Sequence, residues 1–270
     1  MRNSRPCHRS RPARRGVLMR DLLALRAAQE AILASGSALA KPGGLCGPCV
    51  ELLPVTGAAV STLSGQINNE TVCASDDVAF RIDELQFDLG EGPCWEAFAS
   101  RRPVLVPDLR DGPPVTPWPV FSTAIRETSA AALFAFPLYI GATGIGALDL
   151  YRSTAGPLDD EALRDAQVLA DTVAIEVIRR ILASVAQEEA EGVDPSPDPD
   201  PASVLDPWQE SPRSRREIHQ ATGMIMDQLD LSVGAAFARL RAHAFATDNS
   251  VADIAREIVN RRLRFPSDSL

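Results

Sequence analysis

A segment rich in proline and acid, residues 188–212, divides this 270-residue chain more firmly than any other feature. It holds eight acidic residues and no basic one, and prolines alternate through Pro195, Pro197, Pro199 and Pro201. Proline cannot continue a helix and like charges repel, so the segment predicts an extended linker. A long region before it and a short region after it must therefore each form a core of its own.

The region before the linker mixes helical and strand patterns. Apolar residues at helical spacing predict a first helix over 19–40 and a long final helix over 159–186. Between them, alternation predicts strands near 57–64, 71–74, 104–106, 131–139 and 144–151, with short helices at 77–88, 93–100 and 118–127. This order predicts an α+β domain with a mostly antiparallel sheet and flanking helices.

The region after the linker predicts a small unit of three helices. The first spans about 214–229, Ser232 is placed to cap the second, and Ser250 with Asp253 forms a capping pair at the start of the third. Apolar residues recur at helical spacing in all three and predict its core: Ala221, Ala236, Phe237, Leu240, Ala244 and Ala255.

The charges and the histidines exclude several functions. The net charge of −9 combines +6 in residues 1–18, −17 in 19–212 and +2 in 213–270, so a uniformly basic nucleic-acid binder is excluded, whereas a small basic module is not. Residues 1–18 predict a basic disordered arm. Histidine occurs only at His8, His219 and His243, so the middle region has no imidazole for a catalytic pair, and we expect no enzyme.

An uncharged run at 128–148 is long enough to span a bilayer. It alternates in strand fashion and contains Pro137 and a glycine turn, so a buried hairpin is the better interpretation. We therefore expect no membrane partner.

Five cysteines in a chain of this size are too sparse for a disulfide scaffold, and their odd number fits a reducing compartment, so we expect a cytoplasmic protein. The sequence Cys46-Gly47-Pro48-Cys49 resembles the thioredoxin motif but follows no buried strand, so a helix start is favoured over a redox site. A metal site that adds Cys73 and Cys94 is a weaker alternative, because those two are isolated in the sequence.

The C-terminal unit closely resembles the ANTAR domain, an RNA-binding module of bacterial transcription antiterminators. The matching residues are Ile218, Ala221 and Gly223, then Leu231-Ser232-Val233 with the run 236–241 and Ala244, and finally Asp253-Ile254-Ala255 with Ile258-Val259. The middle region resembles the GAF domain of actinobacterial GAF–ANTAR regulators through Glu91-Gly92-Pro93-Cys94, the segment 103–109, Trp118-Pro119, Pro137-Leu138 and the run 145–150.

The resemblance implies six segments along the chain. These are an arm (1–18), an N-terminal helix (19–40), a GAF sensor domain (41–187), the acidic Pro-rich linker (188–212), an ANTAR domain (213–264) and a tail (265–270). It further implies a homodimer whose ANTAR domains bind paired RNA stem-loops beside terminators and thereby prevent termination.

Single-stranded loops expose unstacked base edges, so a few polar and basic side chains can select them. The RNA-contacting candidates are Arg215, Arg216, His219, Arg241, Thr247, Asn249, Ser250, Arg256, Arg261 and Arg262. About half of such residues would only solvate the outer helix faces. Relatives often carry more basic residues before the third helix and a lysine in place of Thr222, so we expect a weak dependence of RNA binding on salt.

No cofactor or metal is identified. An unknown small molecule is a candidate ligand of the GAF domain, in a pocket lined by Phe87, Cys94, Trp95, Trp118, Phe121 and Arg126, although aromatic residues more often form plain core.

The prolines of the linker forbid the continuous helix that joins the two halves in many relatives. The alternative function is a helix-turn-helix-like DNA-binding or protein-interaction module with a GAF sensor.

Overall fold

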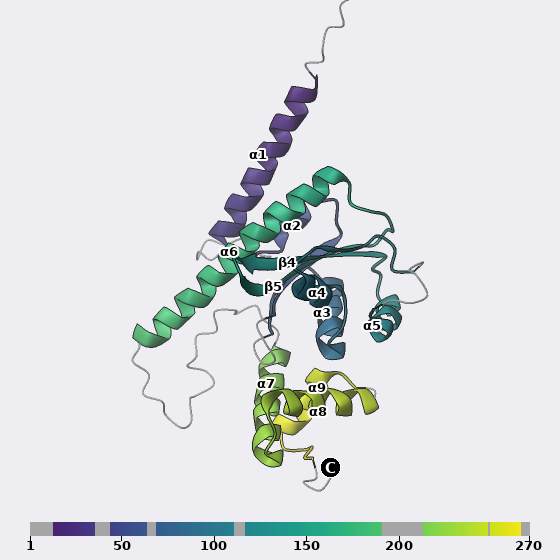
Figure 1. Ribbon diagram of the computed structural model, residues 1–270, viewed down its shortest axis with the longest axis vertical. Helices are drawn as coiled ribbons and strands as arrows, with labels where there is room; N and C mark the ends of the chain where they lie inside the picture. Colours follow the sequence, from purple (N-terminus) through teal and green to yellow (C-terminus); the bar gives the residue numbers. More distant parts are fainter. Residues whose placement is uncertain are drawn as a thin grey trace, which may run out of the picture.

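The computed structural model describes most of both regions (Figure 1). It covers residues 13–35, 44–63, 69–110, 117–190, 213–247 and 249–265, with the backbone alone at several helix ends. The predicted tail apart from Phe265, nearly all of the predicted linker and most of the predicted arm lie outside these residues.

The first region is built around a five-stranded antiparallel sheet in the order β2-β1-β5-β4-β3. The predicted strands are present as β1 (Gly57–Thr62), β2 (Thr71–Ala74), β3 (Val104–Val106), β4 (Ala132–Ile140) and β5 (Thr143–Arg152). The uncharged run forms the β4–β5 hairpin at the centre of the sheet, as predicted. No helix among the described residues is long and apolar enough to cross a membrane.

Helices cover both faces of this sheet (Figure 1). On one face α6 packs on β4 and β5, and α1 packs beside α6. The other face carries α3, α4 and α5. Their bounds are α1 (Ala13–Ala34), α2 (Gly47–Leu52), α3 (Asp77–Leu89), α4 (Pro93–Ser100), α5 (Pro119–Ala124) with the 3₁₀ turn η1 (Ile125–Glu127), and α6 (Asp160–Ala190).

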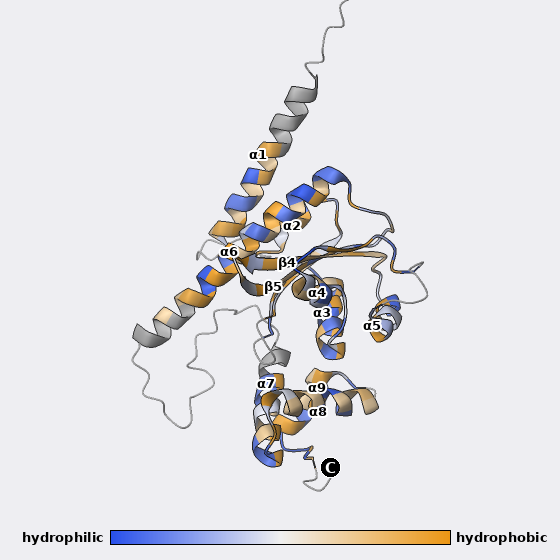
Figure 2. Ribbon diagram, in the orientation of Figure 1, coloured by the Kyte–Doolittle hydropathy of each residue, from blue (hydrophilic) through white to orange (hydrophobic). Residues whose placement is uncertain are grey.

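The sheet is apolar over most of its length (Figure 2). The face toward α1 and α6 buries Phe134, Phe136, Leu148 and Leu150. Because successive residues of a strand point to opposite faces, Ala59, Ser61 and Asp149 lie on the face toward α3.

The second region forms the predicted three-helix unit of α7 (Arg213–Leu229), α8 (Val233–Ala246) and α9 (Val251–Val259). The Ser232 hydroxyl accepts a hydrogen bond from the Ala235 N–H, and the Ser250 hydroxyl accepts one from the Asp253 N–H, as the capping pattern predicts. Five of the six predicted core residues are buried, and Phe237 is half-buried at the edge of the cluster.

Besides the end of α1, which lies at Ala34 instead of 40, two helix boundaries differ from the prediction. The α1 helix begins at Ala13, inside the segment expected to be a disordered arm, and α6 continues to Ala190, past the expected start of the linker. The first difference has a local cause, because residues 13–34 contain no proline and their alanines, leucines and arginines all favour a helix.

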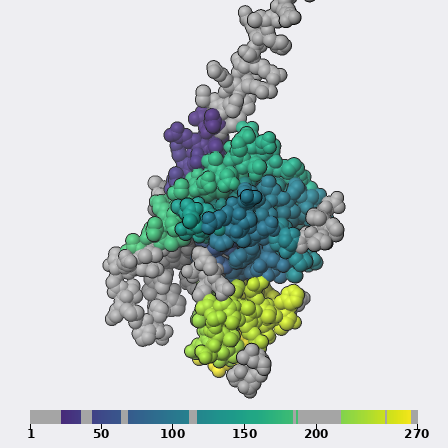
Figure 3. All heavy atoms as spheres, in the orientation of Figure 1, coloured from purple at the N-terminus to yellow at the C-terminus, as the bar shows by residue number. Residues whose placement is uncertain are grey.

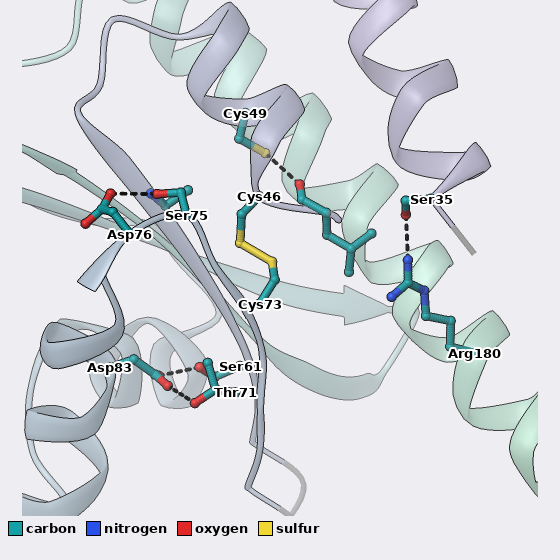
Figure 4. Close-up of a disulfide and its surroundings, with 12 residues drawn as sticks. Ser35, Cys46, Cys49, Ser61, Thr71, Cys73, Ser75, Asp76, Asp83 and Arg180 are labelled. Atoms are coloured by element: carbon teal, nitrogen blue, oxygen red, sulfur yellow. Dashed lines mark hydrogen bonds between the residues drawn. A yellow bond between two sulfur atoms is a disulfide. The ribbon is translucent and has the colours of Figure 1, made fainter. Parts of the chain in front are cut away.

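The cysteine prediction is wrong in one respect, because Cys46 and Cys73 form a disulfide (Figure 4). It joins the start of α2 to β2 in the apolar core. Cys49, the second cysteine of the thioredoxin-like motif, is a buried free thiol, and burial raises its pKa to about 12. The motif therefore marks the start of a helix, as expected, while its first cysteine pairs with a distant partner.

Candidate functional site

The inner face of α3 and the strands beneath it enclose a buried polar cluster, defined here as Ser61, Thr71, Asp83, Gln86 and Asp149. Both carboxylate oxygens of Asp83 accept hydrogen bonds, one from the Ser61 hydroxyl and the other from the Thr71 hydroxyl (Figure 4). Ser61 and Thr71 are register partners on β1 and β2, so the sheet presents the two hydroxyls side by side to α3. The cluster thus fixes one turn of α3 over the edge of the sheet.

Asp149 lies at the bottom of this cluster on β5. Its Oδ2 accepts a hydrogen bond from Gln86 Nε2 at 2.5 Å, whereas its Oδ1 is buried and has no partner among the described residues. Burial, together with the nearby charge of Asp83, raises the pKa of Asp149 to about 8, against the opposing effect of the Gln86 bond. The side chain is therefore mostly protonated at neutral pH.

Gln86 connects the cluster to the predicted Glu91-Gly92-Pro93-Cys94 motif. Its Oε1 accepts from the Cys94 N–H at 2.8 Å, and its backbone carbonyl accepts from the Trp95 indole at 2.7 Å. Gly92 has φ +137°, and a Cβ there would overlap the Gln86 side chain. The motif therefore needs glycine at this position for two reasons, backbone conformation and close approach.

Glu91 of the same motif holds the start of α5. Its Oε1 accepts hydrogen bonds from the N–H groups of Val120 and Phe121, both at 2.7 Å. These are unpaired donors of a helix N-terminus, which a carboxylate satisfies well. The motif therefore ties α3, α4 and α5 together around the polar cluster.

The six residues predicted to line a ligand pocket do not lie together. Cys94 and Trp95 pack with Leu63 and Ala147, while Trp118 and Phe121 belong to a separate cluster under α5. Arg126 is exposed and donates to the Arg110 carbonyl. Phe87 packs against the three-helix unit.

Cys73 and Cys94 do not assemble a metal site either, and no group of three or more ligating side chains occurs among the described residues.

Exposed arginines gather at the C-terminal end of α9. Arg256 pairs with Glu217 of α7 at 3.4 Å and with Asp253 at 2.9 Å, and Arg262 pairs with Glu257 at 3.2 Å. Arg261, at φ +59°, ends the helix as an exposed residue. These three predicted RNA-contacting residues share one end of the unit, and two of them, Arg256 and Arg262, pair with acidic side chains.

The other predicted RNA-contacting residues are placed differently. Thr247 and Asn249 bond to nearby backbone carbonyls in the α8–α9 turn, and Ser250 caps α9. His219 is half-buried on α7. Arg241 faces α3 of the first region. The side chains of Arg215 and Arg216 lie outside the described residues.

Thr222, which stands where relatives often carry lysine, is buried, and its hydroxyl donates to the Ile218 carbonyl at 2.7 Å. A basic side chain at this position would have to leave the core.

Sequence reasoning missed the polar cluster. One signal was present, because Asp149 interrupts an otherwise apolar strand and its removal from water requires a compensating group. Asp83 and Gln86 are also three residues apart, which puts both on one face of a helix.

Family models match both regions of the chain. The GAF domain matches residues 45–177, and the ANTAR domain matches residues 208–259. No curated protein matches the chain significantly.

Several solved structures are similar to this chain at low identity. A domain of a two-component sensor histidine kinase protein from Sinorhizobium meliloti is 18% identical, with TM-score 0.39, covering 66% of this chain and 99% of that one. A free methionine-R-sulfoxide reductase from Neisseria meningitidis is 14% identical, with TM-score 0.40, covering 64% and 95%. The GAF domain of an Acinetobacter phosphoenolpyruvate-protein phosphotransferase is 10% identical, with TM-score 0.44, covering 60% and 95%.

The two family matches, on a sheet domain and a three-helix domain of the expected kinds, identify the chain as a GAF and ANTAR domain-containing protein of the regulatory type.

Proposed function

We propose that this protein is an RNA-binding transcription antitermination regulator whose GAF domain controls its ANTAR domain. The observation that carries the proposal is the ANTAR match over residues 208–259, on a unit whose three helices and caps form as the family pattern requires. The proposal places the protein in the cytoplasm, as a homodimer, on tandem RNA stem-loops near terminators.

The end of α9 supports RNA contacts of limited number. Arg256, Arg261 and Arg262 are exposed there, and guanidinium groups can both contact phosphates and stack on unpaired bases. Local acids balance two of these arginines, so phosphate neutralisation should be modest. This arrangement favours selection of a few loop bases over general attraction to nucleic acid.

The buried polar cluster supports the sensor role of the GAF domain. Asp149 Oδ1 is buried without a partner among the described residues, and such an atom carries a free-energy cost that a bound polar molecule would remove. We propose that the signal acts at this cluster. The signal would be a small molecule that binds there or a proton that Asp149 gains or loses.

Binding of the full chain to a synthetic RNA of two tandem stem-loops, measured by fluorescence anisotropy against duplex DNA of equal length, tests the function. We expect the RNA to bind at least about tenfold more tightly, a difference of about 1.4 kcal/mol. Preference for the duplex DNA would establish the alternative DNA-binding function. Binding of neither nucleic acid would favour a protein-interaction module.

Two arginine substitutions test the RNA-contacting surface. Arg261→Ala with Arg262→Ala should weaken RNA binding and reduce the magnitude of the log–log salt slope by about 1 for each phosphate that the variant no longer neutralises. Arg164→Ala, which removes an exposed arginine from α6 in the GAF domain, is the matched control and should change neither quantity. An equal loss of affinity in both proteins would show that the effect is one of net charge alone.

A further inference from the structure

The ANTAR domain rests on the C-terminal end of α3 (Figures 1 and 3). Phe87, the third-last residue of this GAF helix, is 6% exposed and belongs to the hydrophobic cluster of the ANTAR domain. Its ring lies 5.3 Å from that of Phe237 on α8, at an interplanar angle of 47°. A GAF residue therefore completes the edge of the ANTAR core.

Arg241 of α8 forms the polar interactions of the same contact between the ANTAR domain and α3. Its Nε donates to the Asp88 carbonyl at 2.8 Å, and its Nη2 donates to the Leu89 carbonyl. The last carbonyls of a helix lack partners within the helix and form the negative end of its dipole, so a guanidinium fits there. The guanidinium carbon also lies 5.8 Å from the centre of the Phe237 ring.

Gly90, which ends α3, leaves the space that this guanidinium occupies. It has φ +63°, and a Cβ built there would overlap the Arg241 guanidinium. Burial lowers the pKa of Arg241, while Asp88 and Glu91 act in the opposite direction, so the charge is partly removed from water and faced by acids. An arginine held in this way is not available to a second ligand.

We propose that the C-terminal end of α3 is a docking surface for the ANTAR domain, and that docking withholds Arg241 from RNA. The proposal rests on the RNA-binding function proposed above. Arg241 is one of the predicted RNA-contacting residues, so α3 and RNA compete for one side chain. The described contact is confined to a few residues of each domain, as a reversible contact requires.

The docking surface also provides a route for the signal. The prolines at 195, 197, 199 and 201 predict that no continuous helix joins the domains, so we expect no signal to pass along a linker helix. The same helix α3 holds the polar cluster through Asp83 and Gln86 and holds the ANTAR domain from the next residue onward. A shift of α3 on the sheet would therefore reach Arg241 directly.

Variants on the GAF side test the proposal, because Phe87 and Gly90 are not among the predicted RNA-contacting residues. In the full chain, Phe87→Ala should increase the radius of gyration measured by small-angle scattering. It should also tighten binding of the tandem stem-loop RNA by about threefold to tenfold, because a binding-competent state populated only in part weakens apparent affinity in proportion. Gly90→Ala, which places a methyl group against the guanidinium, should change both in the same direction.

Phe80→Ala is the matched control, since Phe80 lies half-buried on the same helix and outside the ANTAR cluster. An unchanged radius of gyration in both test variants overturns the docking. Separation of the domains without tighter RNA binding overturns the competition for Arg241. If no variant binds RNA, the proposed function fails and the competition with it, whereas the scattering still decides whether the domains dock.

Discussion

The two faces of the GAF sheet are built from different chemistry. Toward α1 and α6, the strands bury Phe134, Phe136 and Leu148 completely or nearly so. Toward α3, the sheet buries Ser61 and Asp149 beside apolar residues such as Leu133. Apolar burial stabilises the fold in proportion to area, whereas each buried polar atom costs free energy unless it is paired. The first face therefore buries apolar residues alone, whereas the second also holds polar groups that carry this cost.

The buried carboxylates sharpen this contrast. Glu176 of α6, with a fully buried side chain, accepts from Arg179 Nε at 2.7 Å and Arg180 Nε at 3.0 Å, and these arginines also bond to the end of α1. Asp149 has one amide donor and one oxygen without a described partner. Glu176 thus has two cationic partners and Asp149 has none, and burial without such a partner raises the pKa of Asp149.

The largest effect is expected on the apolar face. Phe136→Ala removes a fully buried ring and should lower the free energy of unfolding by about 3–5 kcal/mol, measured by urea denaturation. Ile140→Ala, at the exposed end of the same strand, is the control and should cost less than about 1 kcal/mol. Equal costs would show that this face is not the main source of stability.

The disulfide should contribute less than the buried ring, but on the same face. It closes a loop with a sequence separation of 27, so its loss in a Cys46→Ala, Cys73→Ala variant should cost about 3.5 kcal/mol. Reductant should destabilise the native chain by a similar amount and leave the double variant unchanged. A native chain insensitive to reductant would mean that packing alone secures α2 to β2.

The order of the elements and their types could be predicted because these follow local patterns. The alternation of β4 and β5, the helical stripe of α6 and the caps Ser232 and Ser250 each depend on residues close in sequence. The ends of α1 and α6 could not, since helix ends respond to small differences in propensity.

The candidate site could be predicted only in part, because its groups meet through tertiary structure. Asp83 meets Ser61 across a separation of 22 residues, and Arg241 reaches Asp88 across 153. The aromatic residues around the Glu91 motif were predicted to share one pocket, yet Phe87 turns to the other domain while Phe121 enters the core under α5. The spacing of residues along a helix shows which face they share but not what covers that face.

The effect expected on the polar face is a dependence on pH, which is small between neighbouring pH values. The pKa of Asp149 is about 8 in the folded chain, whereas its ordinary value is 3.8. Between about pH 4 and about pH 8, the folded chain therefore keeps a proton on Asp149 that the unfolded chain releases. The free energy of unfolding should therefore fall as pH rises from about 4 to about 8, by up to about 1.4 kcal/mol per pH unit, and level off above. Asp149→Asn should remove this contribution, measured by urea denaturation at pH 5, 6, 7 and 8.

Asp171→Asn, which changes an exposed aspartate on α6, controls for net charge and should keep the native pH dependence. The difference in stability between Asp149→Asn and the native chain should grow steadily with pH, in favour of the variant. A difference that stays constant from pH 5 to pH 8 would mean that Asp149 is ionised throughout and that water or a cation reaches it. The polar face would then be in contact with water. The two faces would differ because one is exposed to solvent, and not because Asp149 keeps a proton within the core.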